Sequence, residues 1–203
     1  MGYQTWFTGG LEFDKPVSEE LKNYINEFSR IRHMVRDPQK IVEIFPNWEK
    51  YCFNGNLGAN GEYFVGEHEI NCLTNYSDTS VVNGNRPPKT QPGLWCQWVI
   101  EGNELVWDQG EKFYEYEEWL IYLIDNFIAP SGYKLNGEIQ FQGEDEDDFG
   151  VICVVDNEVE LKYGMRIMDL SEISTDDLVT ELNNRGYFKN AISSPTLFIA
   201  VQN

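Results

Sequence analysis

LWCQWVIEGNELVW, residues 94–107, decides the fold of this chain. It holds two runs of aromatic, aliphatic and β-branched residues, 94–100 and 104–107, separated by Glu101-Gly102-Asn103. Short runs of this kind form strands, and a brief gap with glycine and asparagine between them forms a tight turn. The sequence therefore predicts a β-hairpin here.

The residues after the hairpin predict a helix and then three strands. Within 113–129 the apolar residues recur three or four positions apart, and Pro130 ends the pattern. Residues 134–142 and 158–163 alternate apolar and polar side chains on either side of the apolar run 151–155, which is typical of an antiparallel meander. The expected fold class is α+β: an antiparallel sheet made of a hairpin and a meander, with helices packed on one face.

The residues at the start of the chain add a strand and a long helix. The apolar stretch 3–13 predicts a strand, and Gly9-Gly10 within it indicates a bulge or a bend. The next segment, 18–36, has a helical apolar stripe, with Ser18 in the N-cap position and Asp37-Pro38 after its end. We expect one helix over that whole segment.

Residues 39–93 are rich in glycine, asparagine and proline, which indicates mainly turns. Within them, 41–48 fits either a short helix or a strand, and 63–65 and 69–73 fit short strands. The stretch 77–93 is expected to be a long loop that leads into the hairpin.

Composition and pattern together predict one main domain. A chain of 203 residues with 41% hydrophobic content can bury a sizeable core. Residues 1–163 are expected to form a compact α+β domain. Residues 164–203 are expected to form a C-terminal extension packed on the same domain, with a helix at 175–184 and then a strand at 196–201. The sequence has no run of apolar residues long enough to span a membrane, no signal-peptide pattern and no CxxC pair. We therefore expect a cytoplasmic protein with free thiols.

The net charge of −19 is concentrated in one part of the chain. Residues 101–160 contain 17 acidic and 2 basic side chains, a net charge of −15. Such a segment repels nucleic acid and anionic membrane and attracts a cationic surface. The predicted partner is a cationic protein surface, and neither direct nucleic-acid binding nor membrane binding is expected.

The candidate binding residues are carboxylates of the predicted meander. Alternate residues of a strand lie about 6.6–6.8 Å apart, so these side chains could imitate the phosphates that a nucleic-acid-processing enzyme holds. The alternative is that an antiparallel sheet simply keeps one polar face. The predicted partner-binding residues are Glu138, Glu144, Asp145, Glu146, Asp147, Asp148, Glu158 and Glu160.

A basic cluster lies near the end of the first predicted helix. Cations there complement the helix dipole and can pair with the protein's own carboxylates. The second interpretation is a pocket for an anionic group, lined by Arg32, His33 and Arg36.

Sequence motifs of catalysis are missing. The chain has no GxSxG, P-loop, GxGxxG or HExxH motif, and it has two histidines in all. We therefore predict no catalytic residue, no metal site and no cofactor. The alternative is a metal-assisted hydrolase that uses Glu138, Glu144 or Asp156.

Four tryptophans lie between residues 95 and 119. Core packing is the expected role of such aromatic residues. A stacking platform for a ligand is the alternative. They are Trp95, Trp98, Trp107 and Trp119.

Five short stretches carry a resemblance. Gly2-Tyr3, Arg32-His33-Met34, PGLWCQW at 92–98, GYKLNGE at 132–138 and QGE at 142–144 resemble a small family of uncharacterised proteins of bacterial and phage genomes. The resemblance covers about residues 1–163 and implies that they form one compact domain. It implies no activity, cofactor or catalytic residue.

Three classes of function are compatible with the sequence. The first is an acidic binding protein of the inhibitor or immunity type, which occupies the cationic surface of a nuclease, a toxin or a phage-defence complex; acting as a DNA mimic is one way to do so. The second is the metal-assisted hydrolase. The third is a housekeeping interaction domain. The distribution of charge favours the first class.

Overall fold

The structure is a computed structural model that describes residues 2–66, 79–164, 174, 176 and 179–180. Contacts between Cα atoms divide the chain into two units, Met1–Arg166 and Ile167–Asn203. The strand expected at 196–201, most of the helix expected at 175–184, and the packing of the extension lie outside the described residues. All the strands that the structure describes belong to the first unit.

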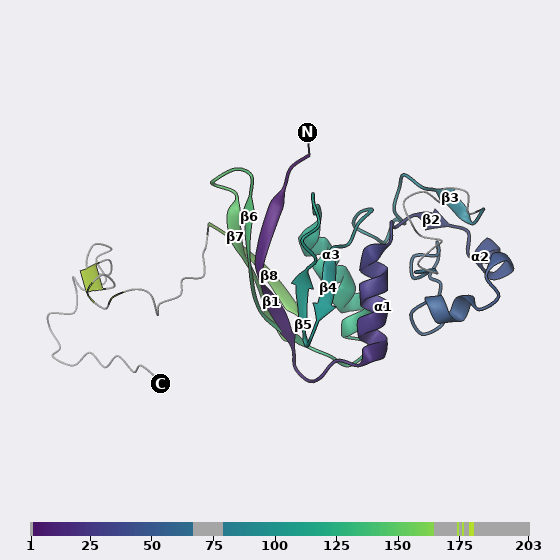
Figure 1. Cartoon of the computed structure of the whole chain (residues 1–203), viewed down its shortest axis with the longest axis horizontal. Helices are drawn as coiled ribbons and strands as arrows, with labels where there is room; N and C mark the ends of the chain where they lie inside the picture. Colours follow the sequence, from purple (N-terminus) through teal and green to yellow (C-terminus); the bar gives the residue numbers. More distant parts are fainter. Residues whose placement is uncertain (1, 67–78, 165–173, 175, 177–178, 181–203) are drawn as a thin grey trace. The chain divides into compact units, whose positions relative to one another are not determined.

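A six-stranded antiparallel sheet forms the centre of the first unit (Figure 1). The predicted hairpin and meander are both present, joined through the N-terminal strand, so the predicted α+β fold is confirmed. In spatial order the strands are β4 (Trp98–Glu101), β5 (Glu104–Trp107), β1 (Thr5–Phe13), β6 (Leu135–Gly143), β7 (Phe149–Val155) and β8 (Glu158–Tyr163).

Strand β1 bends without losing its register. It pairs with β6 at every position from Thr5, opposite Gly143, to Phe13, opposite Leu135, so it contains no bulge. Gly9 has a φ of +102°, and a Cβ atom there would lie 2.7 Å from the carbonyl oxygen of Glu138. Glycine therefore allows the bend and the close approach to β6.

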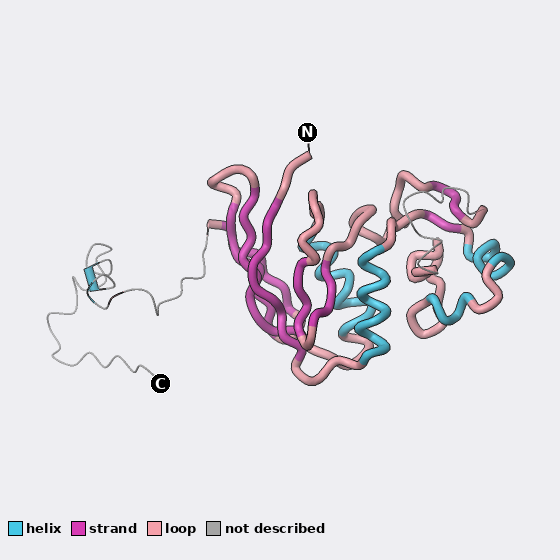
Figure 2. The backbone as a smooth tube through the Cα atoms, in the orientation of Figure 1, coloured by secondary structure: helices cyan, strands magenta, loops and turns pink. Residues whose placement is uncertain are grey.

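Two helices cover the same face of the sheet (Figure 2). Helix α1 (Glu19–Arg30) follows its N-cap residue Ser18, whose Oγ accepts a hydrogen bond from Leu21 N at 3.3 Å. The second is α3 (Tyr116–Leu123), which continues as the π-helical turn η2 (Ile124–Ile128). No helix among the described residues of this unit covers the opposite face of the sheet, which we call the open face.

The prediction that the first helix extends to Arg36 was wrong. The chain leaves the helix at Ile31, and His33 N then donates to Leu94 O at 2.9 Å. Strand β2 (Val35–Arg36) follows and pairs with β3 (Val81–Asn83), which lies within the segment expected to be a loop. Backbone pairing with distant residues overrides the helical pattern of this segment.

The helix after the hairpin also differs in detail from its pattern. It begins at Tyr116, because Glu115 has a left-handed φ of +53°. Near its end, Ala129 N donates to Ile124 O, five residues earlier, at 2.9 Å, and Asn126 Nδ2 donates to Tyr122 O at 2.9 Å. The helix therefore ends in a π turn.

Residues 38–64 contribute a second, smaller core. The segment with two interpretations is a short helix, α2 (Pro38–Ile44), followed by the 3-10 turn η1 (Trp48–Tyr51). The strand expected at 63–65 is reduced to a single bridge between Cys52 and Phe64, and 69–73 lies outside the described residues. The buried residues of this core are Ile41, Phe45, Cys52, Leu57 and Phe64.

The main core lies between the sheet and the two helices. Trp98 and Trp119 are fully buried in it, while Trp95 and Trp107 are half-buried. Phe7 contacts Trp98 and Trp107 edge to face, with ring centroids 5.3 and 5.5 Å apart. Core packing, the expected role of the tryptophans, accounts for the two buried ones.

The outer edge of β4 is capped by α1. Asn26 accepts from Ile100 N at 2.7 Å and donates to Ile100 O at 3.1 Å. The hydroxyl of Ser29 donates to Trp98 O. These side chains satisfy backbone groups that would otherwise form an exposed strand edge.

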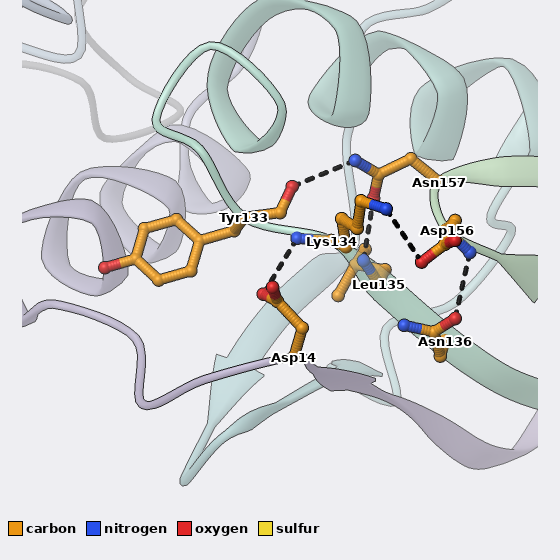
Figure 3. A network of polar contacts seen from close by, with 7 residues as sticks. All are labelled: Asp14, Tyr133, Lys134, Leu135, Asn136, Asp156 and Asn157. Carbon is orange, nitrogen blue, oxygen red and sulfur yellow. Dashed lines mark hydrogen bonds and ion pairs between the residues drawn. The ribbon is translucent and has the colours of Figure 1, made fainter.

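A polar network closes the end of the sheet where β7 turns into β8 (Figure 3). Asp156 and Asn157 have φ values of +51° and +76°, as a two-residue hairpin turn requires. Asn157 Oδ1 accepts from Leu135 N at 2.7 Å, and Asp14 Oδ1 accepts from Lys134 N at 3.0 Å. The turn is thereby fixed to the start of β6.

Leu123→Ala tests the packing of α3 on the sheet. Leu123 is fully buried, so the truncation should lower the free energy of unfolding by roughly 2–5 kcal/mol. Ile121→Ala is the matched control, because Ile121 lies on the same helix and is 39% exposed. Urea denaturation measures both, and a loss at Leu123 no larger than at Ile121 would contradict this packing.

Candidate functional site

The open face of the sheet is strongly acidic. Side chains alternate between the two faces of a strand. Those on the face opposite the helices include six glutamates from five strands. Lys162 is the only basic side chain that the described strands place on this face. The glutamates are Glu12, Glu101, Glu104, Glu138, Glu158 and Glu160.

Three of these glutamates lie directly opposite one another on adjacent strands. Glu104 of β5 pairs with Glu101 of β4 on one side and with Glu12 of β1 on the other. All three side chains are exposed, and none has an ion-pair partner in the part of the chain that the structure describes. Like charges in directly opposite positions destabilise a sheet. We call Glu12, Glu101 and Glu104 the glutamate row.

The glutamate row was not predicted from the sequence. The alternation of apolar and polar residues within each strand predicts only that each of these glutamates faces solvent. Their juxtaposition depends on β1 lying beside β5, a pairing between residues far apart in sequence that no local pattern shows.

The predicted glutamates of the meander form a second acidic group on the same face. Glu138 and Glu160 lie on either side of Cys153, in directly paired positions. Glu138 Oε1 accepts a weak hydrogen bond from Cys153 Sγ at 3.7 Å, and Glu160 forms an ion pair with Lys162 at 3.0 Å. Glu158 lies opposite Val155, which is 67% exposed.

The remaining predicted residues form the loop between β6 and β7, residues 144–148, which we call the acidic loop. Its first four carboxylates are exposed, and Asp148 is half-buried. Tyr3 Oη donates to Asp148 Oδ2 at 2.6 Å, and this hydrogen bond raises the pKa of Tyr3. Gln4 N donates to Glu144 Oε1 at 3.1 Å. The residues before β1 therefore hold the acidic loop in place.

A cleft of 940 Å³ joins the acidic loop to the hairpin. Its walls are the first half of β1 and residues 106–112, which follow the turn of the hairpin. Glu101, Glu111 and Glu144 line it together with Trp6 and one basic residue, Lys112. Acidic groups from three parts of the sequence therefore line one cleft, with Glu144 near the Thr5 end of β1 and Glu101 toward the Phe13 end.

The basic residues near the end of α1 reach separate neighbours. Arg32 Nε donates to Gly84 O at 2.9 Å, and its guanidinium lies 5.5 Å from the ring centroid of Trp95. Arg36 is buried, and its Nη1 donates to Ser80 Oγ at 2.8 Å. The two guanidinium groups therefore contact different parts of the chain, Arg32 near Gly84 and Trp95 and Arg36 at Ser80.

His33 is a core residue. Its ring lies between Phe28 and Trp119, with centroid distances of 4.3 and 4.7 Å, and it is 2% exposed. Burial lowers the pKa of His33 from 6.5 to about 3, although a hydrogen bond to the Phe28 backbone opposes the shift. The imidazole is therefore neutral at pH 7 and adds no positive charge to an anion pocket.

Two carboxylates of the hydrolase alternative lie far apart along the sheet. Glu144 precedes β7 and Asp156 follows it, so they lie beyond opposite ends of that strand. Asp156 Oδ1 is also engaged by Lys134 Nζ at 3.1 Å, as Figure 3 shows. Among the described residues, no group of three or more His, Cys, Asp or Glu side chains could hold a metal ion.

Comparison with known proteins gives no further guide to function. No family model, curated protein or solved structure matches the chain. The family resemblance over residues 1–163 stays a prediction. Within the described ranges, every helix is too short or too polar to cross a membrane.

Glu104→Gln tests the repulsion within the glutamate row. The amide removes the charge that faces two others, so the free energy of unfolding should rise by roughly 0.5–1 kcal/mol at low salt. Glu158→Gln is the control, because Glu158 lies opposite Val155. Denaturation at low and high salt measures the gain, which should shrink as salt screens the charges. Equal gains in both variants would show that only net charge matters.

His33→Asn tests the burial of a neutral imidazole. The unfolded chain binds a proton at His33 below pH 6.5, whereas the folded protein does so only near pH 3. The neutral imidazole therefore contributes fully to the free energy of unfolding above pH 6.5, and this contribution is lost as the pH falls toward 3. Between pH 7 and pH 4.5 the parent should lose roughly 2–3 kcal/mol more than the variant. Parallel pH profiles of the two proteins would contradict this assignment.

Proposed function

We propose that this protein binds a cationic partner protein through its open face and acidic loop, as an inhibitor or immunity protein does. The observation that supports it best is the glutamate row. Three carboxylates in directly opposite positions reduce folding stability. Cations of a partner would relieve that repulsion, so the arrangement favours binding over stability.

The chemistry of the surface supports one class of partner. Glutamates spaced along and across strands resemble the phosphates of a nucleic-acid backbone, which nucleases and other nucleic-acid-processing enzymes hold with Lys and Arg. A nuclease, a toxin or a phage-defence complex is the proposed target. Binding would cover the cationic surface that the target needs for its own substrate.

The test uses a partner captured from the native host and identified by mass spectrometry. Association is then measured with a variant that carries glutamine at Glu12, Glu101 and Glu104. The control variant carries glutamine at Glu43, Glu49 and Glu118, which are also exposed but lie outside the open face. Both variants change the net charge equally.

Electrostatic steering should separate the two variants. The open-face variant should associate about tenfold or more slowly at low salt, and the parent's rate should fall steeply as salt is added. The control should remain close to the parent. Equal association rates for all three proteins at every salt concentration would rule out this surface as the binding site.

A further inference from the structure

Strand β1 is paired along the whole of one edge but along only part of the other. On one side it pairs with β6 at every position from Thr5 to Phe13. On the other side β5 pairs with it at Leu11 and Glu12. Within residues 2–66 and 79–164, no strand pairs with this second edge between Thr5 and Gly10. The free part of the edge lies in the cleft.

The hydrogen bonds at the end of β1 show which backbone groups face the cleft. Phe13 N donates to Asn103 O on the β5 side, at 3.1 Å, and Asp14 N donates to Lys134 O on the β6 side, at 2.9 Å. Backbone groups of successive residues point to opposite sides of a strand. The N–H and C=O of Phe7 and Gly9 therefore point into the cleft, and no other described backbone pairs with them there.

The separation of β1 from the hairpin has a local cause. The hairpin keeps its own register beyond β5, where Asp108 N donates to Gln97 O at 3.0 Å. Strand β1 follows β6 instead, and Gly9 provides the bend. Figure 1 shows β1 and β5 meeting at one end and separating toward the other. Phe7 and Gly9 both line the cleft between them.

The cleft has an apolar floor and an acidic rim. The rings of Phe7 and Trp107 meet in the floor, with centroids 5.5 Å apart. Glu101, Glu111 and Glu144 contribute three negative charges to the lining against the single positive charge of Lys112. An extended segment with basic side chains matches both the free backbone groups and this charge.

We propose that the cleft binds an extended basic segment of the partner, which adds to β1 as an antiparallel strand. The inference rests on the proposed function and specifies how the partner binds. Backbone hydrogen bonds to Phe7 and Gly9 supply the pairing, as in other cases of strand addition. Side chains of the segment opposite these two residues face the filled floor and must be small. The alternate side chains face the open side and are basic.

The outer edge of β8 is the competing site for an added strand. Gly164 N donates to Phe149 O at 2.8 Å, so the backbone groups of Val159 and Leu161 point away from β7. Side chains of both signs, Glu158, Glu160 and Lys162, flank that edge, and such charges discourage pairing.

The probe is a short peptide that alternates lysine and alanine, with its ends acetylated and amidated. A matched peptide carries N-methyl groups on the alanines, which removes the donors that face β1 and keeps every charge. Amide hydrogen exchange of the full chain is followed by NMR at single residues, with and without each peptide.

The unmodified peptide should slow exchange at Phe7 and Gly9 by about tenfold or more, because these amides gain acceptors. Trp6, Thr8 and Gly10 should change little, since their amides already face β6. The methylated peptide should give no protection. Glutamine at both Glu101 and Glu111 should weaken binding of the unmodified peptide about tenfold, whereas glutamine at both Glu43 and Glu49 should not.

Several results would overturn the proposal. Protection at Val159 and Leu161 in place of Phe7 and Gly9 would move the site to the edge of β8. Protection that depends on protein concentration without peptide would make a second copy of the chain the occupant. Equal binding of both peptides would exclude strand addition.

The two proposals fail separately. The strand proposal alone fails if the captured partner associates in a salt-dependent way that requires the glutamate row while no peptide protects Phe7 and Gly9. The proposed function alone fails if the peptide protects these amides but association with the captured partner depends on neither salt nor the row.

Discussion

The pairing of β1 with two distant parts of the chain holds the sheet together. No strand of the hairpin β4–β5 pairs with a strand of the meander β6–β7–β8, and β1 lies between the two groups and pairs with both. Without it, two small sheets would each expose an edge and lack a common core. Its apolar side chains, Phe7, Leu11 and Phe13, are buried with those of both groups of strands.

This central strand also explains why one face of the sheet is open to water. Joining the two groups of strands produces one wide sheet, and α1 and α3 cover a single face of it. The other face must remain polar in water. Polarity alone would be met by threonine, asparagine or a mixture of charges, as Lys162 beside Glu160 illustrates. The glutamate row goes further, because it collects one sign of charge at the junction between β1 and β5.

Local pattern was sufficient for much of the fold. The hairpin, the strands of the meander and the inward face of α3 follow from periodicity and turn residues, because their partners are close in sequence. The segment 31–36 could not be predicted in this way, since His33 has helical spacing in sequence but its backbone N–H donates to Leu94 O.

The candidate site was likewise predictable only where its residues are close in sequence. The acidic loop and the glutamates of the meander belong to one local unit, whereas the glutamate row and the cleft arise where residues near 10 meet residues near 105. The second interpretation of the basic cluster, an anion pocket, assumed that Arg32, His33 and Arg36 lie together at a helix end. Helix α1 ends at Arg30, before all three.

The position of β1 in the sheet also governs how the protein must fold. Thr5 pairs with Gly143 and Phe13 with Leu135, so β1 leaves the ribosome long before β6, the strand that it needs along its whole length. Contacts so remote in sequence slow folding, and during synthesis they leave an unpaired apolar strand exposed to neighbouring chains. Once residues 101–160 have been made, their dense negative charge would keep partly folded chains apart through mutual repulsion.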